Sequence, residues 1–401
     1  MKAIVLAGTT PHIALLNKLK KRGFETVLID GNPNCPARTY ADRYIEESTL
    51  DYEKVLKIAT EEKADLVIAI VGDHINAVCC YVAEKLGLPH PYSYENALDA
   101  TRKSRMKPLF NKYGILTPEY YILDRDEKRE IRLEFPLVVK PSDSNSSKGV
   151  FCVTSEEDFY DKIEEAFQNT KEGKVIVEKY IDGVEIEVNC LAIDGKAHIC
   201  VTKDLPNLPL NGKELNIGGY RIPGEPYEQD PEQIQEIAQK VCTAYRLKNG
   251  AFFYQAKYCN GKVYVLEAAA RMDGGTIYES TNYCCGIDYV DLAIDGFLGK
   301  TITQIPHYNG RRFVGKALRM KPGIFDRVVG ADKLVEDGTL TNYWVFAKSG
   351  TKVTDRRIST FMLAILLAEC NSYEEGHEKI NRALREVAIL DADGNDASDW
   401  R

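Results

Sequence analysis

Apolar and amphipathic stretches alternate along the first ninety residues. Residues 2–6 are an apolar run that predicts a strand, and in residues 11–22 the side chains of Ile13, Leu16 and Leu19 recur at helical spacing. The alternation continues with expected strands over 26–30 and 65–71 and expected helices over 52–62 and 74–86. Such repetition predicts a parallel, doubly wound α/β sheet, whose ligand crevice lies at the carboxyl ends of its strands.

Three predicted loops meet at that crevice: residues 8–11, residues 30–33 and the pair Gly72-Asp73. The first loop lacks a GxGxxG fingerprint, so the pattern does not predict a dinucleotide site there. Asp73 has two interpretations. Its carboxylate could hold a substrate amine, or it could be the N-cap of the following helix, which is the commoner use of aspartate at such a position.

The pattern becomes purely helical between residues 89 and 118, with one helix expected over 100–113, which places a domain boundary near residue 93. Beyond it come an apolar strand over 136–140 (PLVVK), a loop of small residues over 141–149 and a second strand over 150–153. Small side chains let backbone N–H groups and hydroxyls approach phosphate oxygens, and Lys140 and Lys148 supply neutralising charge. We therefore predict a hairpin that covers phosphates; a serine-rich surface turn is the alternative.

Residues 174–180 (KVIVEKY) form another apolar strand that ends in charge, and Glu185 begins the next one. An extended linker after a buried strand can present backbone amides and carbonyls to a purine edge, while a carboxylate beyond the turn can accept ribose hydroxyls. Glu178 and Glu185 are placed for these two tasks. Taken separately, either glutamate is more often a solvated strand end.

Two strand-like runs, residues 252–257 and 262–268, flank the pair Asn260-Gly261, which is a strong hairpin signal. The hairpin sets Gln255 and Glu267 where their oxygens can face one site beside Arg271. Hard cations such as Mg²⁺ prefer carboxylate and amide oxygens and keep phosphate oxygens as further ligands, so the arrangement suits a metal-bound triphosphate. A solvated hairpin with incidental polar residues is the alternative.

Composition narrows the class of protein. The chain has 401 residues, 44% apolar and 28% charged, which indicates a globular protein of two or three domains. Its net charge of -8 argues against binding to a nucleic-acid backbone, and no run of about 18 apolar residues predicts a membrane span. Eleven cysteines without CxxC spacing do not resemble a disulfide framework. We expect a cytoplasmic protein.

Four pieces of the chain, taken in order, resemble the ATP-grasp superfamily. They are Lys103 in the helix before Gly114, PLVVKP ending the first cover strand, VIVEKYIDGVEIEV at 175–188 and LEAAARMDGG at 266–275. The preceding residues look like the pre-grasp domain of carbamoyl-phosphate synthetase halves and biotin carboxylase, and residues 354–389 look like their carboxyl-terminal lobe. The resemblance implies an α/β domain over 1–93, an ATP-grasp domain over 94–300 with a cover subdomain near 115–185, and a small mixed lobe over 301–401.

The resemblance also implies roles for particular residues. Lys103 and Lys140 would contact the phosphates of ATP, and Arg271 would face an acyl phosphate. The cover loop would comprise Ser146, Ser147, Lys148 and Gly149. The adenine hinge would comprise Glu178, Lys179 and Ile181. Glu185 would bind the ribose. Gln255 and Glu267 would hold Mg²⁺, with Mn²⁺ as an alternative metal. Apart from the resemblance, we expect Asp73, Arg221, Gly274 and Gly275 to contact the substrate.

The chain departs from the family pattern in two places. Metal-binding strands of this superfamily usually run Glu-x-Asn-x-Arg, whereas this chain has Ala269 in place of the Asn. Asp273 or Asn282 could substitute, or phosphates and water could hold the metal. The cover loop replaces a glycine-rich run with serines, whose hydroxyl groups can also donate to phosphate.

Residues 203–227 form a long insertion rich in Pro and Gly, and a loop of this length in a compact domain is usually functional or disordered. Lys203, Tyr220 and Arg221 could receive an anionic substrate across from Arg271. A lid without direct contacts to the substrate is the alternative.

Three hypotheses for the activity remain. The first is an ATP-dependent ligase that joins a carboxylate and an amine through an acyl phosphate, on an amino acid or small carboxylate, with small molecules as its partners and a homodimer as a frequent assembly of such relatives. The second is a bicarbonate-using carboxylase or carbamoyl-phosphate-forming enzyme, against which stand the missing second half and carrier segment. The third is a nucleotide-binding regulatory protein without turnover, motivated by Ala269.

Overall fold

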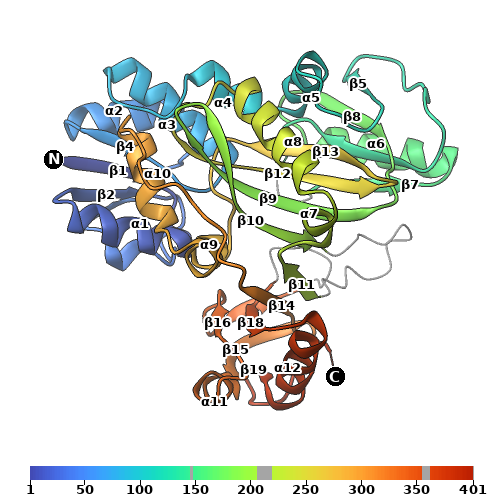
Figure 1. The fold of residues 1–401 in the computed structure, drawn as a ribbon. Helices are drawn as coiled ribbons and strands as arrows, with labels where there is room; N and C mark the ends of the chain where they lie inside the picture. Colours follow the sequence, from blue (N-terminus) through green and yellow to red (C-terminus); the bar gives the residue numbers. More distant parts are fainter. Residues whose placement is uncertain (145–147, 206–218, 355–361, 401) are drawn as a thin grey trace.

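The N-terminal domain is a parallel sheet of four strands in the order β3-β2-β1-β4, drawn in blue in Figure 1. The computed structural model describes residues 1–144, 148–205, 219–354 and 362–400. The elements are β1 Lys2–Leu6, α1 Thr10–Lys21, β2 Glu25–Ile29, the 3-10 helix Arg38–Tyr40, β3 Arg43–Ile45, α2 Tyr52–Glu61, β4 Leu66–Ile68 and α3 Asp73–Leu86. The predicted doubly wound sheet is confirmed. The pattern did not predict β3, because this short strand at the sheet edge has no buried apolar run.

Two short helices, α4 Tyr94–Thr101 and α5 Lys103–Lys112, follow where we predicted one. The helix breaks at Arg102, whose backbone is extended (φ -102°, ψ 114°). Just after the break, the Lys103 amide donates to the Ser142 carbonyl at 2.9 Å, a tertiary bond that the periodicity of the sequence does not encode. The break thus fixes the start of α5 against the loop after β6.

The cover subdomain is an antiparallel sheet in the order β5-β8-β6-β7 with α6 packed on it. Its elements are β5 Tyr120–Asp124, β6 Leu137–Pro141, β7 Phe151–Val153, α6 Glu156–Gln168 and β8 Lys174–Lys179. Leu137 and Val139 of β6 and Phe159 and Ile163 of α6 share one buried core. The Ser155 hydroxyl caps α6 by accepting from the Asp158 amide.

The central sheet is antiparallel, in the order β10-β9-β12-β13. Its strands are β9 Val184–Ile193, β10 Lys196–Leu205, β12 Gly250–Cys259 and β13 Lys262–Ala269, and the adjoining helices are α7 Glu225–Gln229 and α8 Pro231–Ala244. Asn260 (φ 51°) and Gly261 (φ 72°) form the predicted two-residue turn. Ile186 and Val188 pack with α8, so the alternation of the strand turns Glu185 and Glu187 to the opposite face.

The carboxyl-terminal lobe lies below the rest of the molecule in Figure 1 and holds two small antiparallel sheets, β11-β14-β18-β16 and β17-β15-β19. Its elements are β11 Gly219–Ile222, β14 Arg312–Leu318, β15 Gly323–Val329, α11 Ala331–Glu336, β16 Asn342–Val345, β17 Thr351–Val353, β18 Ala364–Cys370, α12 Tyr373–Glu386 and β19 Ala388–Asp391. β11 belongs to the long insertion but pairs with β14, where Gly315 leaves room for the Tyr220 ring; a Cβ at Gly315 would lie 2.1 Å from it. The insertion therefore joins the central sheet to the lobe.

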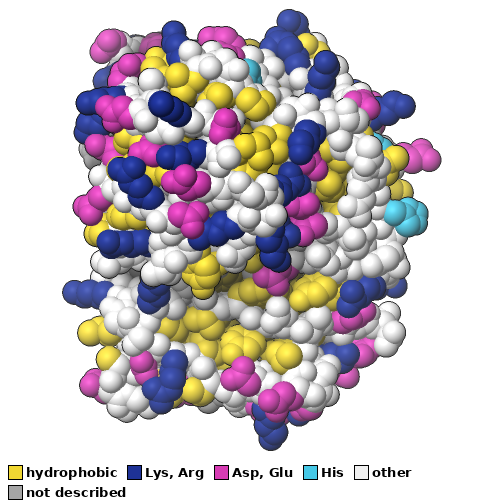
Figure 2. Space-filling view, turned by 90° about the vertical axis from the view of Figure 1, so that its left-hand side faces the viewer, with side chains coloured by type: hydrophobic (Ala, Val, Ile, Leu, Met, Phe, Trp, Pro, Cys, Tyr) yellow, Lys and Arg dark blue, Asp and Glu magenta, His cyan; other side chains and the backbone are white. Residues whose placement is uncertain are grey.

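Helices α9 Ile277–Cys285 and α10 Tyr289–Phe297 follow the central sheet, and α10 packs on α1 of the N-terminal domain. Arg22, which directly follows α1, binds Asp291 and Asp295 of α10 at 2.9 and 2.7 Å. Figure 2 shows basic and acidic side chains interspersed on the face that it presents. Among the described residues, every helix is too short or too polar to cross a bilayer. The domain boundaries stay a prediction.

Candidate active site

A row of polar side chains crosses the central sheet on the face opposite α8. The strand register places Lys203 of β10 beside Glu187 of β9, Glu187 beside Gln255 of β12, and Gln255 beside Glu267 of β13. Lys203 Nζ lies 2.8 Å from Glu187, and Gln255 Nε2 donates to Glu187 Oε2 at 3.2 Å. Lys103 of α5 closes the row, with its Nζ 3.2 Å from Glu267. The predicted metal ligands Gln255 and Glu267 therefore do lie side by side.

A β-bulge produces this neighbourhood. The turn pairs Cys259 with Lys262 and Ala256 with Val265, and without a shift this register would set Leu266 opposite Gln255. The register slips by one residue between Ala256 and Gln255, so Glu267 takes that place instead. A bulge re-aims the side chains that follow it, and here it turns a carboxylate toward the polar row.

The two predicted phosphate lysines lie at the edge between the central sheet and the cover subdomain. Lys103 is buried, and its Nζ also donates to the Ser144 carbonyl at 3.0 Å. Lys140 at the end of β6 is buried as well, with its Nζ 2.5 Å from Glu178. Both cations are held by carboxylates of neighbouring strands and are available to a polyanion that competes with those carboxylates.

The predicted hinge is more restricted than the sequence indicated. The Lys179 amide donates to Glu119 at 2.8 Å and the Tyr180 amide to Pro136 at 3.0 Å, so neither amide is left for a purine edge. The Glu178 carboxylate points to lysines rather than to the linker. Glu178 could therefore contribute to the hinge only through its backbone, because its side chain is held by the two lysines. The role of Ile181, which is half-buried, stays a prediction.

Glu185, the predicted ribose ligand, lies on the polar face of β9 beside Lys257 of β12, with 3.2 Å between the charged groups. Burial raises the pKa of Glu185, and the charge of Lys257 opposes that shift. A half-buried carboxylate with one cationic partner keeps lone pairs for a hydroxyl donor. The position is compatible with the predicted role.

Arg271 and Asp73 form a two-pronged ion pair between segments 198 residues apart. Arg271 Nε and Nη2 donate to the two Asp73 oxygens at 2.6 and 2.8 Å, and Nη1 donates to the Met272 carbonyl at 2.7 Å. Burial disfavours the charged carboxylate, but the charge and hydrogen bonds of Arg271 outweigh it and hold the pKa of Asp73 below its usual value. The alternative of an N-cap is wrong, because Gly72 (φ 95°) occupies the cap and α3 begins at Asp73.

A second charged cluster lies beyond Arg271. Lys203 Nζ lies 3.2 Å from Asp273 as well as 2.8 Å from Glu187. Burial, assisted by the charge of Asp273, raises the pKa of Glu187 to about 7, while Lys203 acts in the opposite direction. The Tyr220 ring lies 6.0 Å from Lys203 Nζ. The inserted strand β11 therefore presents Tyr220 to this cluster.

Arg221, the neighbour of Tyr220 on β11, does not lie with Lys203. It donates to Asp204 at 2.6 Å, pairs with Glu225 and covers the Tyr373 ring at 4.8 Å. Successive strand residues point to opposite faces, so Tyr220 and Arg221 cannot both face one cluster. A substrate would have to displace two carboxylates to reach Arg221.

The remaining predicted residues lie in the connecting loops. Ser146 and Ser147 are outside the described residues. Lys148 is exposed, and Gly149 (φ 73°) has a backbone that favours glycine. Gly275 (φ 65°) and Gly274 follow β13 where an added Cβ would meet open space, so packing does not demand Gly274.

Ala269, which stands where the family has a metal-binding Asn, is buried and carries no ligand atom. The two residues that could replace this ligand differ in burial. Asp273 is half-buried beside Lys203, whereas Asn282 is exposed on α9. Within the described residues, no group of three His, Cys, Asp or Glu side chains could hold a metal ion.

Sequence reasoning missed Lys107 and Glu187. Lys107 lies four residues after Lys103, on the same face of α5, and is 0% exposed. Glu187 lies two residues after Glu185 in a strand that is otherwise apolar on alternate positions, and is 2% exposed. Spacings of four in the helix and two in the strand were signals that could have identified both.

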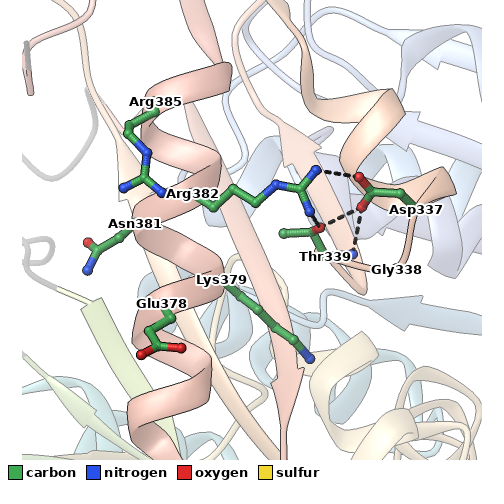
Figure 3. A pocket seen from close by; sticks show the side chains of 8 residues that line it. All are labelled: Asp337, Gly338, Thr339, Glu378, Lys379, Asn381, Arg382 and Arg385. Carbon is green, nitrogen blue, oxygen red and sulfur yellow. Dashed lines mark hydrogen bonds and ion pairs between the residues drawn. The ribbon is translucent and has the colours of Figure 1, made fainter.

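A separate hollow of about 620 Å³ lies on the carboxyl-terminal lobe (Figure 3). Arg382 of α12 points across it and binds Asp337 and Thr339, each at 2.6 Å. These charges are paired within the lobe, and none of the predicted site residues lines the hollow.

Comparisons with known proteins bear on the family and on the fold. The family described as D-ala D-ala ligase C-terminus matches residues 109–276. The chain is 26% identical over 387 residues to a formate-dependent phosphoribosylglycinamide formyltransferase of Actinobacillus pleuropneumoniae, covering 93% of this chain and 92% of that protein. It is 27% identical over 270 residues to the carbamoyl phosphate synthase large chain of Pyrococcus furiosus, covering 65% of this chain but only 25% of that protein.

The fold is similar to a solved structure over nearly its whole length. The crystal structure of L-amino acid ligase from Bacillus licheniformis has a TM-score of 0.80 and 18% identity, covering 97% of this chain and 98% of that one. The family model, the curated relatives and the solved structure together support an ATP-grasp ligase.

Proposed function

We propose that this protein is an ATP-dependent carboxylate–amine ligase that forms an amide bond through an acyl phosphate. The observation that carries the proposal is a set of three fixed cations. Lys103 pairs with Glu267, the cross-strand neighbour of Gln255. Arg271 is held by Asp73 and also feels the charge of Glu267, and Lys140 pairs with Glu178. Cations at fixed positions stabilise the charge that develops when a γ-phosphoryl group moves to a carboxylate. The three cations of the family pattern are all present, although Ala269 replaces a metal ligand of that pattern. Their presence argues against a binding protein without turnover.

The metal donor set fits Mg²⁺ in part. Glu267 offers a carboxylate and Gln255 an amide oxygen, both acceptable to a hard cation. A bound metal would neutralise phosphate charge and orient the phosphates for transfer. Since Glu267 is the one anionic donor of this pair, nucleotide phosphates and water would complete the coordination.

Each residue then has a defined task. Lys103 and Lys140 exchange their carboxylate partners for phosphate oxygens, which draws the triphosphate onto the sheet edge. Arg271, oriented by Asp73, holds the acceptor carboxylate near the γ-phosphate and stabilises the acyl phosphate. The cover subdomain excludes water, which would otherwise hydrolyse that intermediate.

We propose an amino acid as one substrate. Two cations, Arg271 and Lys203, and three carboxylates, Asp73, Asp273 and Glu187, surround the region beyond the phosphates. Such a site favours a molecule that carries an ammonium group as well as a carboxylate over a simple anion. The similarity in fold to an L-amino acid ligase supports this substrate class.

Phosphate release measured with ATP across a library of amino acids and small carboxylates tests the proposal. Release should require a carboxylate, and mass spectrometry should detect an amide in equal amount. Hydrolysis stimulated by bicarbonate and by no organic acid would instead support the second hypothesis. ATP binding without any stimulated turnover would support the third.

A further inference from the structure

Lys107 is a fully buried charged residue to which the proposed mechanism assigns no task. It lies in α5 and is 0% exposed. Its Nζ lies 2.8 Å from Glu178 Oε2 and donates to the Thr117 hydroxyl at 2.6 Å. Burying an ammonium group is costly unless it is paired, and surface positions on α5 were available to a lysine. Packing alone therefore does not explain why a lysine is buried beside Glu178.

Glu178 connects Lys107 to the phosphate site. Its other oxygen, Oε1, accepts from Lys140 Nζ at 2.5 Å, so two lysines hold one buried carboxylate. Burial disfavours the charge on Glu178, but the two lysines outweigh it and keep the pKa of Glu178 below its usual value. Burial lowers the pKa of Lys107 to about 8, against the charge of Glu178, so both groups are ionised near pH 7.

The position of Lys140 creates a conflict that Lys107 resolves. To bind phosphate, Lys140 must turn away from Glu178, which is 2% exposed. A buried carboxylate that loses its cation is strongly destabilised, so a lone Lys140–Glu178 pair would resist nucleotide binding. With Lys107 on the other oxygen, Glu178 keeps a cation throughout.

We propose that Lys107 is a positioning residue that holds the Glu178 carboxylate in place, so that Lys140 can exchange Glu178 for a nucleotide phosphate. The inference rests on the proposed ATP site, because it assigns Lys140 to the phosphates. Lys107 itself touches no substrate. The other groups that face this pair are Lys140, the Tyr120 ring 5.9 Å from Lys107 Nζ, the Thr117 hydroxyl and, through its charge, Glu267.

The test is the ATP dissociation constant of Lys107→Met between pH 6 and 7.5, measured by calorimetry. Lys112→Met, at an exposed position of the same helix, is the matched control. At pH 7.5 the Lys107 variant should bind ATP roughly tenfold more weakly, since Glu178 then competes for Lys140. The loss should shrink as the pH falls, because Glu178 without Lys107 takes up a proton more easily and releases Lys140. Wild type and Lys112→Met should show no such trend.

A double-mutant cycle separates this role from simple packing. If Lys107 acts through Glu178, removing Lys107 in a Glu178→Gln background should change the ATP dissociation constant by less than about twofold. The comparison of Glu178→Gln with Glu178→Gln/Lys107→Met can be made even if Lys107→Met alone does not fold, because the double variant lacks both buried charges. An equal loss in the two backgrounds, or a loss that does not depend on pH, would overturn the inference.

Wild-type protein provides the check on the underlying site. If it binds no ATP, the proposed function fails, and with it the role of Lys140. If it binds ATP and Lys140→Ala weakens that binding while Lys107→Met does not, the ATP site stands and the positioning role of Lys107 is wrong.

Discussion

The two halves of the candidate site differ in the balance of their charges. On the phosphate side, three lysines, Lys103, Lys107 and Lys140, face two carboxylates, Glu178 and Glu267. On the substrate side the balance is reversed, with two cations among the three carboxylates Asp73, Asp273 and Glu187.

The difference matches the two ligands that we propose. A triphosphate is a polyanion and needs excess positive charge, whereas an amino acid is a zwitterion and needs both signs. In each half the charged side chains already form ion pairs with one another, so binding exchanges ion pairs rather than creating them. Such exchange lowers the cost of keeping charges buried and leaves selectivity to geometry.

The strongest test of the substrate side is Arg271→Met. Product formation should be abolished, because an uncharged side chain cannot stabilise the acyl phosphate, while ATP affinity should stay within about threefold since the phosphate lysines are untouched. The variant leaves Asp73 without its cation, so Arg271→Met/Asp73→Asn is the folded control to assay beside it. Normal amide formation by either variant would refute the assignment.

On the phosphate side, Lys140→Ala should lower ATP turnover on the order of a hundredfold or more, corresponding to roughly 2.7 to 4 kcal/mol of lost transition-state stabilisation. The fold should persist, since Lys140 ends β6 rather than filling the core of the cover subdomain. Steady-state kinetics with circular dichroism as the control measures both. Turnover at the wild-type rate would mean that the phosphates bind elsewhere.

The charge of Lys107 predicts a pH effect on stability. Its folded pKa of about 8 lies below the usual 10.5, so between these values the unfolded chain binds more protons than the folded one. The free energy of unfolding should therefore rise with pH across this window relative to Lys107→Met, by up to about 3 kcal/mol. Urea titrations of both proteins at pH 7.5 and 10 measure the difference. A difference that is constant with pH would show that Lys107 titrates normally.

A smaller effect distinguishes two roles of Asp73. Asp73→Asn keeps the shape of the side chain but removes the negative charge that orients Arg271. We therefore expect kcat to fall about tenfold, while the KM for the amine changes little. Asp73→Glu should recover part of the rate. If the KM for the amine rises instead and kcat does not change, Asp73 binds the amine directly.

The weakest expected signal concerns the metal. Glu267 is already paired with Lys103 and Gln255 is neutral, so Mg²⁺ should bind feebly to the protein without nucleotide. Calorimetry with Mg²⁺ alone, and again in the presence of a non-hydrolysable ATP analogue, makes the comparison. Tight binding to the free protein would reveal a carboxylate ligand that we have not assigned.

The sequence by itself determined the elements and several neighbourhoods within them. Helical periodicity and continuous apolar runs marked the helices and strands of the N-terminal domain, because such a helix buries one face whereas these strands are buried on both faces. The Asn260-Gly261 turn identified the hairpin that carries Gln255 and Glu267. These features depend on residues close together in the chain, so local patterns encode them.

Tertiary structure decided the partners. The register shift between Ala256 and Gln255 places Glu267 opposite Gln255, whereas the register set by the turn alone would place Leu266 there. Asp73 meets Arg271 across 198 positions, and Lys107 meets Glu178 only because α5 packs on β8. Spacing within an element can indicate that a charge is buried, but an ion pair between distant segments depends on how whole elements pack, so the sequence pattern could not predict the charge balance of the two halves.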